Sequence, residues 1–407
     1  MEWSDGGQTL FSQGGFAAVT PQAGYTRNSA FTLRDGDITY PPSMALLFFA
    51  FALASVLPLP FVIVAWGVPI PARWWHPHEA VFGLGSGLCS GFLLTALPHW
   101  LGTKRPGRLA VGLVLGAWCA GRAGALTWAY GFQTALIFGD TVVWTALASY
   151  AIWITHRSSR VRPRKVAWIL AAVAVASLKA KLDILGDNHP AAALRWGEAA
   201  LGLLVLVMLG RMLPSFTFEQ LNKRDLSAVR RRTDSLDHFG LLTAAVCLVS
   251  WSFWPQSVPT QVLGGVATGL NLVRLMRLRG WRCGWDPNLT PFHIAMGFFT
   301  LGLCLIAAQG IVAEASPTHA MLAGSMTLSA IAVGARMLEG HLGIRAHKRL
   351  SMAVAFVLAG IVLRLFSPFH PPVLIWAAGT WMTGFGFLTL AVYLPAIARA
   401  MNLRAAR

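Results

Sequence analysis

Hydrophobic positions along this 407-residue chain gather into runs that are long enough to cross a membrane as helices. A bilayer core of roughly 30 Å requires about 20 apolar residues in helical conformation. Pro and Gly residues separate the runs, for example at Pro190, Pro255 and Pro317. The pattern predicts an all-α, polytopic integral membrane protein with about twelve transmembrane helices. The predicted spans are 44–67, 78–99, 108–130, 132–155, 165–186, 190–213, 236–254, 258–280, 290–312, 317–340, 349–366 and 372–397.

Polar positions between the runs carry positive charge on every second loop, and this alternation predicts an orientation. Lys and Arg residues follow the second, fourth, sixth, eighth and tenth predicted spans, for example across 157–165 and 223–232, and they also end the chain. Because cytoplasmic loops carry the excess of Lys and Arg, both termini are predicted to be cytoplasmic. The chain is divided into a polar N-terminal tail at 1–43, a membrane domain at 44–398 and a basic C-terminal tail at 399–407.

The composition agrees with a membrane protein and argues against a nucleic-acid partner. Hydrophobic residues make up 55% of the chain and charged residues only 12%, whereas a soluble domain carries about 25% charged residues. The net charge of +17 would favour nucleic acid in a soluble protein, but here it lies in short loops between spans. The expected partner is therefore the lipid bilayer. The five cysteines form no CxxCH motif, so covalently attached haem is not expected.

Histidines at the start of the second predicted span are candidate metal ligands. His76 and His78 flank Pro77, which fits the first turn of a helix. In that arrangement two neutral imidazoles can converge on one metal without sharing a helix face, and they suit copper, iron and zinc. Glu79 is placed to orient a ligating ring. The alternative interpretation is a set of interfacial residues at the level of the lipid headgroups.

The histidines of the second and tenth spans sort into two levels. His319 and His341 lie 22 residues apart, and His78 and His99 lie 21 residues apart, which is roughly 30 Å along a straight helix. If these residues bind metals, one bundle holds two separate sites rather than a binuclear centre. The outer group is His76, His78 and His319, and the inner group is His99, His293 and His341.

Charged residues inside predicted spans usually face the bundle interior or a water-filled cavity. Those in the outer parts of the third to sixth spans are Arg122, Asp140, Lys179, Lys181, Asp183, Arg195 and Glu198. Three of these share the fifth span, and they are interpreted as pairing with cofactor carboxylates, lining a proton path or binding an anionic substrate. The alternative is an internal ion pair between Lys181 and a nearby carboxylate. Arg336 belongs to a sparser inner group with Arg274 and Asn271.

Four stretches carry a resemblance to a known family: Trp75 to Gly83, Gly91 to Trp100, Gly210 to Thr217, and His319 through Gly324, Met326 and Arg336 to His341. They resemble the NnrS proteins, and the resemblance covers nearly the whole chain after residue 40. It implies b-type haem, copper and a redox role in nitric oxide metabolism and nitrosative stress. The sequence differs from the family pattern at His99, where Asn is usual, at Asn271, where His is expected, and in the fifth span, which often carries a His.

The resemblance, together with the charge pattern, assigns roles to particular residues. The metal-ligand candidates are His76, His78, His99, His293, His319 and His341. The cofactor-binding candidates are His78, His293, His319, His341, Arg122 and Arg211. The catalytic candidates are Glu79, Lys179, Lys181, Asp183 and Arg336.

The first functional hypothesis is a haem- and copper-dependent oxidoreductase in the bacterial inner membrane. It would bind or convert nitric oxide or a related small nitrogen species, with an unknown electron donor, at the outer level. The second hypothesis is a transporter or a metal or haem carrier with twelve spans. The third is a sensor or scavenger that binds nitric oxide without turnover.

Overall fold

In the computed structural model, the described residues are helical and contain no β-strand. One isolated bridge joins Gln309 and Val312. The all-α prediction is confirmed. The predicted N-terminal tail lies outside the described residues apart from Ser43, and so do the last two residues of the predicted C-terminal tail. The described residues are 43–59, 72–130, 132, 134–158, 164–224 and 234–405.

Nine helices are long and apolar enough to cross a membrane, by length and composition, among the residues that the structure describes. Three of these nine are composite, because a π-helical segment joins two α-helices. The composite helices are α3 (Ala72–His78), η1 (Glu79–Leu84) and α4 (Gly85–Leu101); α12 (Ser316–Thr318), η4 (His319–Met326) and α13 (Thr327–Leu342); and α15 (Val373–Phe387), η5 (Leu388–Tyr393) and α16 (Leu394–Ala405). The other six are α5 (Arg108–Ala129), η2 (Ala135–Phe138) with α6 (Gly139–His156), α8 (Ala191–Lys223), α9 (Ser235–Phe253), α11 (Thr290–Ala307) and α14 (His347–Phe366).

Three further helices coincide with predicted spans but are shorter or more polar: α1 (Met44–Val56), α7 (Arg164–Leu185) and α10 (Val258–Arg277). With them, each of the twelve predicted spans corresponds to a helix or composite helix in the described part of the chain. α8 continues through Pro214 to Lys223, beyond the predicted end at 213, and α1 ends at Val56, before the predicted end at 67. An ion pair of 2.7 Å between Lys223 and Glu219 supports the last turn of α8.

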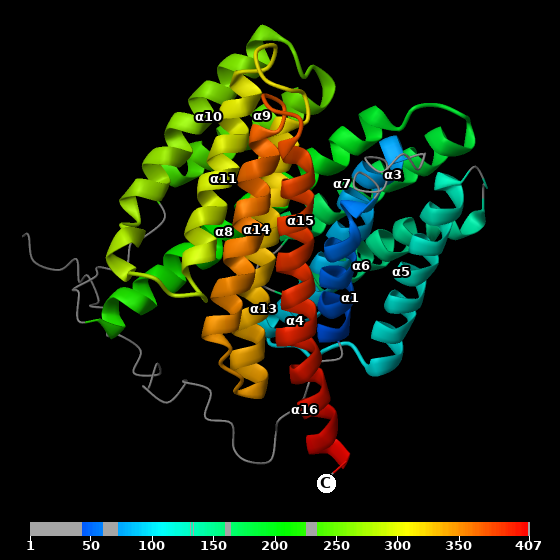
Figure 1. Ribbon diagram of the computed structural model, residues 1–407, viewed down its shortest axis with the longest axis vertical. Helices are drawn as coiled ribbons and strands as arrows, with labels where there is room; N and C mark the ends of the chain where they lie inside the picture. Colours follow the sequence, from blue (N-terminus) through cyan, green and yellow to red (C-terminus); the bar gives the residue numbers. More distant parts are fainter. Residues whose placement is uncertain are drawn as a thin grey trace, which may run out of the picture. The chain divides into compact units, whose positions relative to one another are not determined.

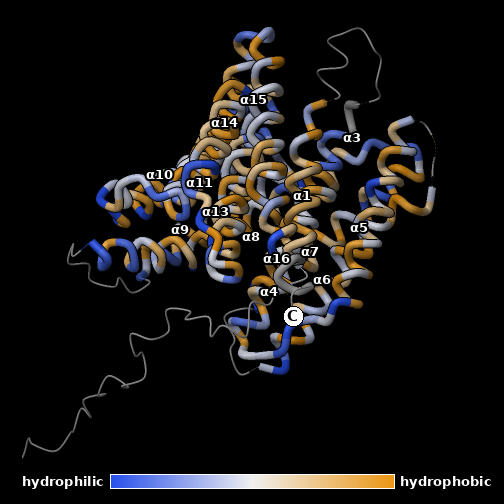
Figure 2. Tube along the Cα trace, turned by 60° about the horizontal axis from the view of Figure 1, so that its bottom comes forward, coloured by the Kyte–Doolittle hydropathy of each residue, from blue (hydrophilic) through white to orange (hydrophobic). Residues whose placement is uncertain are grey.

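The two histidine-bearing composite helices lie at the centre of the bundle. An apolar stretch of 18 residues is 83% buried within 75–101 and 78% buried within 316–342, compared with 28% within α5. In Figure 1, α4 lies beside α1, and α13 lies beside α14. The hairpins α5–α6 and α9–α10 lie further out. Figure 2 shows hydrophobic residues along most helices and hydrophilic residues mainly at their ends, as expected when the outward faces contact lipid.

Both π-helical segments in these central helices coincide with histidines. η1 begins directly after His78, and η4 begins at His319. A π-helical turn contains an extra residue, which changes the direction of side chains and frequently marks a functional site. The carbonyl of Gly83 in η1 accepts hydrogen bonds from Trp118 Nε1 at 2.9 Å and Ser86 Oγ at 3.0 Å. The sequence pattern did not predict either π-helical segment.

Candidate functional site

Two histidines of the outer group, His76 on α3 and His319 on η4, form a pair. Their ring centroids are 6.3 Å apart and the rings are inclined by only 14°. The structure thus brings together residues that are more than 240 positions apart in sequence. The sequence predicted that His76 and His319 lie at the same level of the bundle, and this geometry agrees with that prediction.

Backbone carbonyls orient both rings of the pair. His76 Nδ1 lies 3.1 Å from the carbonyl oxygen of Leu57, and His319 Nδ1 lies 2.7 Å from that of Ala315. A carbonyl oxygen only accepts, so each Nδ1 donates its proton. In the neutral rings Nε2 therefore carries the lone pair. A ring held in this way presents Nε2 as the nitrogen that can bind a metal.

His78 has different neighbours from His76, which contradicts the predicted convergence of these two rings. The prediction placed Pro77 in the first helical turn, with His76 before the helix. α3 instead begins at Ala72, so His76 and His78 both lie in the helix. Residues two apart on a helix point about 200° away from each other. His78 consequently faces α5, α6 and α7 rather than His319.

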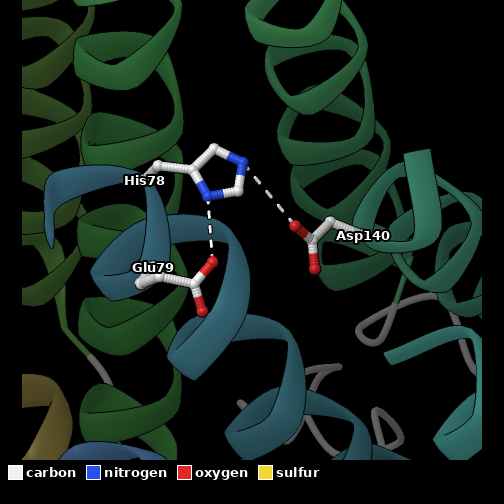
Figure 3. Close-up of side chains that lie close together, drawn as sticks. All are labelled: His78, Glu79 and Asp140. Atoms are coloured by element: carbon white, nitrogen blue, oxygen red, sulfur yellow. Dashed lines mark hydrogen bonds and ion pairs between the residues drawn. The ribbon is translucent and has the colours of Figure 1, made fainter. Parts of the chain in front are cut away.

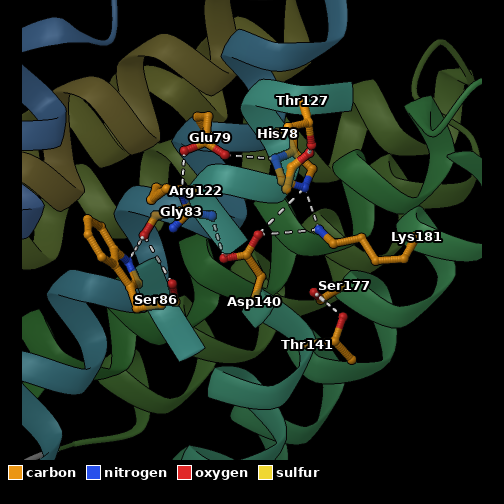
Figure 4. Close-up of polar contacts among 12 residues, drawn as sticks. His78, Glu79, Gly83, Ser86, Arg122, Thr127, Asp140, Thr141, Ser177 and Lys181 are labelled. Atoms are coloured by element: carbon orange, nitrogen blue, oxygen red, sulfur yellow. Dashed lines mark hydrogen bonds and ion pairs between the residues drawn. The ribbon is translucent and has the colours of Figure 1, made fainter. Parts of the chain in front are cut away.

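The environment of His78 is a largely buried set of five side chains, called here the polar cluster: His78, Glu79, Arg122, Asp140 and Lys181. η1 follows His78 directly and supplies Glu79, while α5, α6 and α7 supply the other three. Figure 3 shows His78 between Glu79 and Asp140, and Figure 4 shows how the basic residues complete the network. Arg122 is the most exposed of the five, with 14% of its side chain accessible.

Each nitrogen of the His78 ring has a partner in the polar cluster. Nδ1 lies 3.0 Å from Glu79 Oε1, and because an ionised carboxylate only accepts, Nδ1 donates. Nε2 then accepts from the ammonium group of Lys181, with which it is in direct contact. The same ammonium lies 3.5 Å from Asp140 Oδ2. The ring is therefore fixed in both orientation and tautomer.

Arg122 connects the two carboxylates. Its Nε lies 2.5 Å from Glu79 Oε2, and its Nη2 donates to Asp140 Oδ1. With His78 neutral, two positive and two negative groups cancel. This balance explains how ionised side chains persist in a buried site, since unpaired charge there would cost several kcal/mol. The alternative interpretation of Lys181, an internal ion pair, is the one that the geometry supports.

Glycines make room for the polar cluster. A Cβ at Gly83 would collide with the Arg122 guanidinium and the Glu79 carboxylate, and a Cβ at Gly121 would collide with Asp140. The small residues of the second and third spans thus have a local purpose beyond helix packing, which is to let charged side chains reach one another.

The fifth-span charges do not act as one group. Lys179 and Asp183 form their own ion pair of 2.8 Å, with Lys179 39% exposed. Lys179 also lies 5.9 Å above the ring of Trp196. Only Lys181 reaches the polar cluster. The prediction that grouped Lys179, Lys181 and Asp183 is therefore wrong in its geometry, because i and i+2 residues lie on opposite sides of a helix.

Asp140 belongs to the polar cluster although it was not among the predicted site residues. Its position in the sequence could have identified it as a site residue, because it is a charged residue inside a predicted span at the level of Glu79. A second such carboxylate is Glu198 on α8, which is buried and accepts a hydrogen bond of 2.9 Å from Thr318, next to His319. Arg195 lies 3.7 Å from Glu314 near the same end.

The inner group lies at the other end of the central helices. His293 on α11 contacts Thr217 of α8, with 3.1 Å between Nε2 and Oγ1. The His293 ring also packs where a side chain on Gly280 would lie. His341 ends α13 within electrostatic range of Arg105 and His99, and His99 is exposed at the end of α4.

The other two arginines among the predicted site residues, Arg211 and Arg336, lie against aromatic rings at this inner end. Arg211 lies 4.0 Å above the Trp100 ring, and Arg336 lies 3.6 Å above the Phe216 ring. Arg336 also forms an ion pair of 3.2 Å with Glu219. These contacts tie α8 to α4 and to α13.

The helix that carries both His319 and His341 is continuous from Ser316 to Leu342, so the two histidines lie at its opposite ends. The same holds for His78 and His99 in the helix from Trp75 to Leu101. The predicted two-level arrangement of the histidines therefore describes their placement, and metal binding at either level stays a prediction.

A comparison with curated proteins finds no match to the chain. The model of the family described as NnrS protein matches residues 44–400, which include both histidine levels and the whole polar cluster. The chain therefore belongs to the NnrS family of membrane proteins.

Proposed function

We propose that this multi-pass protein is a haem- and copper-binding redox protein of the bacterial inner membrane that acts on nitric oxide or a related small nitrogen species. Membership of the NnrS family indicates a nitric-oxide-related membrane protein. The observation that carries the finer proposal is the pair of nearly parallel, half-buried imidazoles of His76 and His319 at the outer ends of the two central helices.

The two rings are close enough that His76 and His319 could both contribute to one metal site, with 6.3 Å between the ring centroids and 14° between the ring planes. Both Nδ1 atoms donate to carbonyl oxygens of the backbone, which is the usual way that a ligating histidine is oriented. Imidazole is a ligand for haem iron and for copper.

His76 and His319 would hold one of the two metals, and members of the inner group would contribute to the other, since His99, His293 and His341, all in the described part of the chain, do not form a set of three convergent ligand atoms. When bound, haem iron or copper supplies a redox-active ion that can take a diatomic ligand. The protein's own contribution at the outer level is a preorganised polar environment. Arg122 and Lys181 carry positive charge close to His78 and are held rigidly by Glu79 and Asp140.

Metal analysis and optical spectroscopy of the purified full chain test the proposal. We expect a Soret band that shifts when nitric oxide is added, together with iron and copper in the sample. His76→Ala and His319→Ala should each remove the outer metal, while His370→Ala, at an exposed position between α14 and α15, should leave the metal content unchanged. A wild-type sample without Soret absorbance and iron, or full metal content in both variants, would contradict the proposal.

The same sample separates the alternative functions. A sensor or scavenger would bind nitric oxide but show no turnover with a reductant. A transporter or metal carrier would show no stoichiometric haem that responds to nitric oxide. The polar cluster itself offers no particular support for transport, because its charges are satisfied by one another.

A further inference from the structure

Three members of the polar cluster together form a group of potential metal ligands. One ligand atom each from His78, Glu79 and Asp140 lie within 4.8 Å of one another, and all three side chains are buried. One imidazole with two carboxylates is a donor set that divalent transition metals accept. This group is distinct from the His76–His319 pair, because His78 points away from that pair towards α6 and α7.

A positive charge of the protein itself already occupies this group. The Lys181 ammonium contacts His78 Nε2 and lies 3.5 Å from Asp140 Oδ2. These are two of the atoms that a metal would need. The lysine is fully buried, and its ammonium lies 4.7 Å from the centre of the Phe82 ring, whose face also attracts a cation.

The other oxygen of each carboxylate is also paired with a cation. Arg122 takes Glu79 Oε2 and Asp140 Oδ1, so the carboxylates face a cation on two sides. With Lys181 present the polar cluster is neutral. A divalent ion added to it would bring two uncompensated charges into a buried site, next to a guanidinium and an ammonium, which is strongly unfavourable.

We propose that Lys181 is a built-in cation that closes the His78–Glu79–Asp140 group to divalent metals. In this protein the outer level then holds one metal position, at His76 and His319, and not two. The single metal position rests on the proposed function, whereas the closure of the His78–Glu79–Asp140 group depends only on the contacts of Lys181. The Lys181 side chain on α7 is then the reason that the outer level holds one metal and not two.

Zinc binding to the purified full chain tests the role of Lys181. Lys181→Ala removes the ammonium and leaves the polar cluster, with Arg122 still in place, at one net negative charge. We expect this variant to bind one more equivalent of Zn²⁺ than the wild type, and its thermal midpoint to rise when zinc is added. The matched control is Lys179→Ala on the same helix, which should gain no zinc.

Two further variants identify where the added zinc binds. Lys181→Ala combined with Asp140→Asn should lose the extra equivalent. Lys181→Ala combined with His319→Ala should keep it, so the result does not depend on whether the outer pair holds a metal. An unchanged zinc content in folded Lys181→Ala, or a gain that survives Asp140→Asn, would overturn the proposal.

A second measurement applies if Lys181→Ala does not fold with or without zinc. Because Lys181 occupies the group in the wild type, Glu79→Gln in an otherwise unchanged chain should leave the metal content as it is. Loss of one metal equivalent in Glu79→Gln would show that a metal, and not the lysine, lies among these ligands in the native protein. That outcome would also overturn the proposal, and an unchanged content would support it.

Discussion

Lys179 and Lys181 are two residues apart on α7, but their surroundings give them very different energetic roles. Lys181 is buried against Asp140, while Lys179 is 39% exposed in an i,i+4 pair with Asp183. We expect Lys181→Met to lower the free energy of unfolding by about 3 kcal/mol or more, because it leaves a buried carboxylate without its partner. Lys179→Met should cost less than about 1 kcal/mol. Thermal or denaturant unfolding of both variants measures the difference.

Equal losses in the two lysine variants would contradict this account of the polar cluster. Combining Lys181→Met with Asp140→Asn should recover part of the loss, since the second change removes the uncompensated charge. A double variant that is less stable than Lys181→Met alone would show that Asp140 is held mainly by Arg122.

At the residue scale, the sequence identified most members of the site but not their partners. Charged residues inside spans are conspicuous, so Glu79, Arg122 and Lys181 were found by composition alone. The predicted grouping of these residues was wrong where it joined positions two apart on a helix. The 200° between i and i+2 positions separates His78 from His76 and Lys181 from Lys179. The link from His78 to α6 and α7 depends on tertiary packing, which the one-dimensional pattern does not contain.

At the scale of elements, the contact between α5 and the η2–α6 segment depends on a glycine. A Cβ at Gly124 would overlap the backbone of Leu136 and Ile137, whereas Gly112 on the same helix has open space around it. We expect Gly124→Ala to destabilise the protein by about 1–3 kcal/mol, because backbone cannot move aside as a side chain can. Gly112→Ala should be neutral or stabilise it by up to about 1 kcal/mol. Unfolding curves of the two variants test this.

We expect Gly124→Ala also to disturb the polar cluster, whereas Gly112→Ala should not. Asp140 is the second residue of α6, which follows η2 directly, so moving η2 away from α5 would lengthen the contact between Asp140 and Arg122. A Gly124→Ala variant as stable as Gly112→Ala would show that α5 and η2 are less closely packed than the Gly124 contacts indicate.

Helix positions were predictable because a membrane span needs a long apolar run, and nearly every run has clear ends. The exceptions have physical causes. α8 continues through Pro214 because its last turns are supported by polar pairs such as Lys223 with Glu219. The π-helical segments were not predicted because one extra residue in a turn does not change the average hydrophobicity of the run.

At the scale of the whole molecule, the burial of the histidine-bearing helices unites fold and site. The helices 75–101 and 316–342 are the two most buried of the nine long apolar helices in the described chain. Their outer ends bring His76 to His319, and their inner ends carry His99 and His341. The sequence predicted the two levels from helix length alone. It did not predict which helices lie at the centre, because apolar runs facing lipid and apolar runs facing protein look alike.

The orientation of the bundle follows from its loop charges and can be measured directly. Arg345, Lys348 and Arg349 lie between α13 and α14 or at the start of α14, and the turn between α14 and α15 contains His370 without Lys or Arg. The positive-inside rule therefore places Lys348 in the cytoplasm and His370 outside. Both positions are exposed, so single cysteines placed there should be accessible to water.

Labelling with a membrane-impermeant maleimide in intact cells distinguishes the two sides. In a background without the native cysteines, His370→Cys should react in intact cells and Lys348→Cys only after the membrane is permeabilised. The reversed labelling pattern would show that the whole bundle has the opposite orientation in the membrane, because the helices between these positions and the histidines are continuous. The His76–His319 pair and the polar cluster would then face the cytoplasm. Since the levels are fixed to the helices, this one measurement decides on which side of the membrane the proposed outer metal lies.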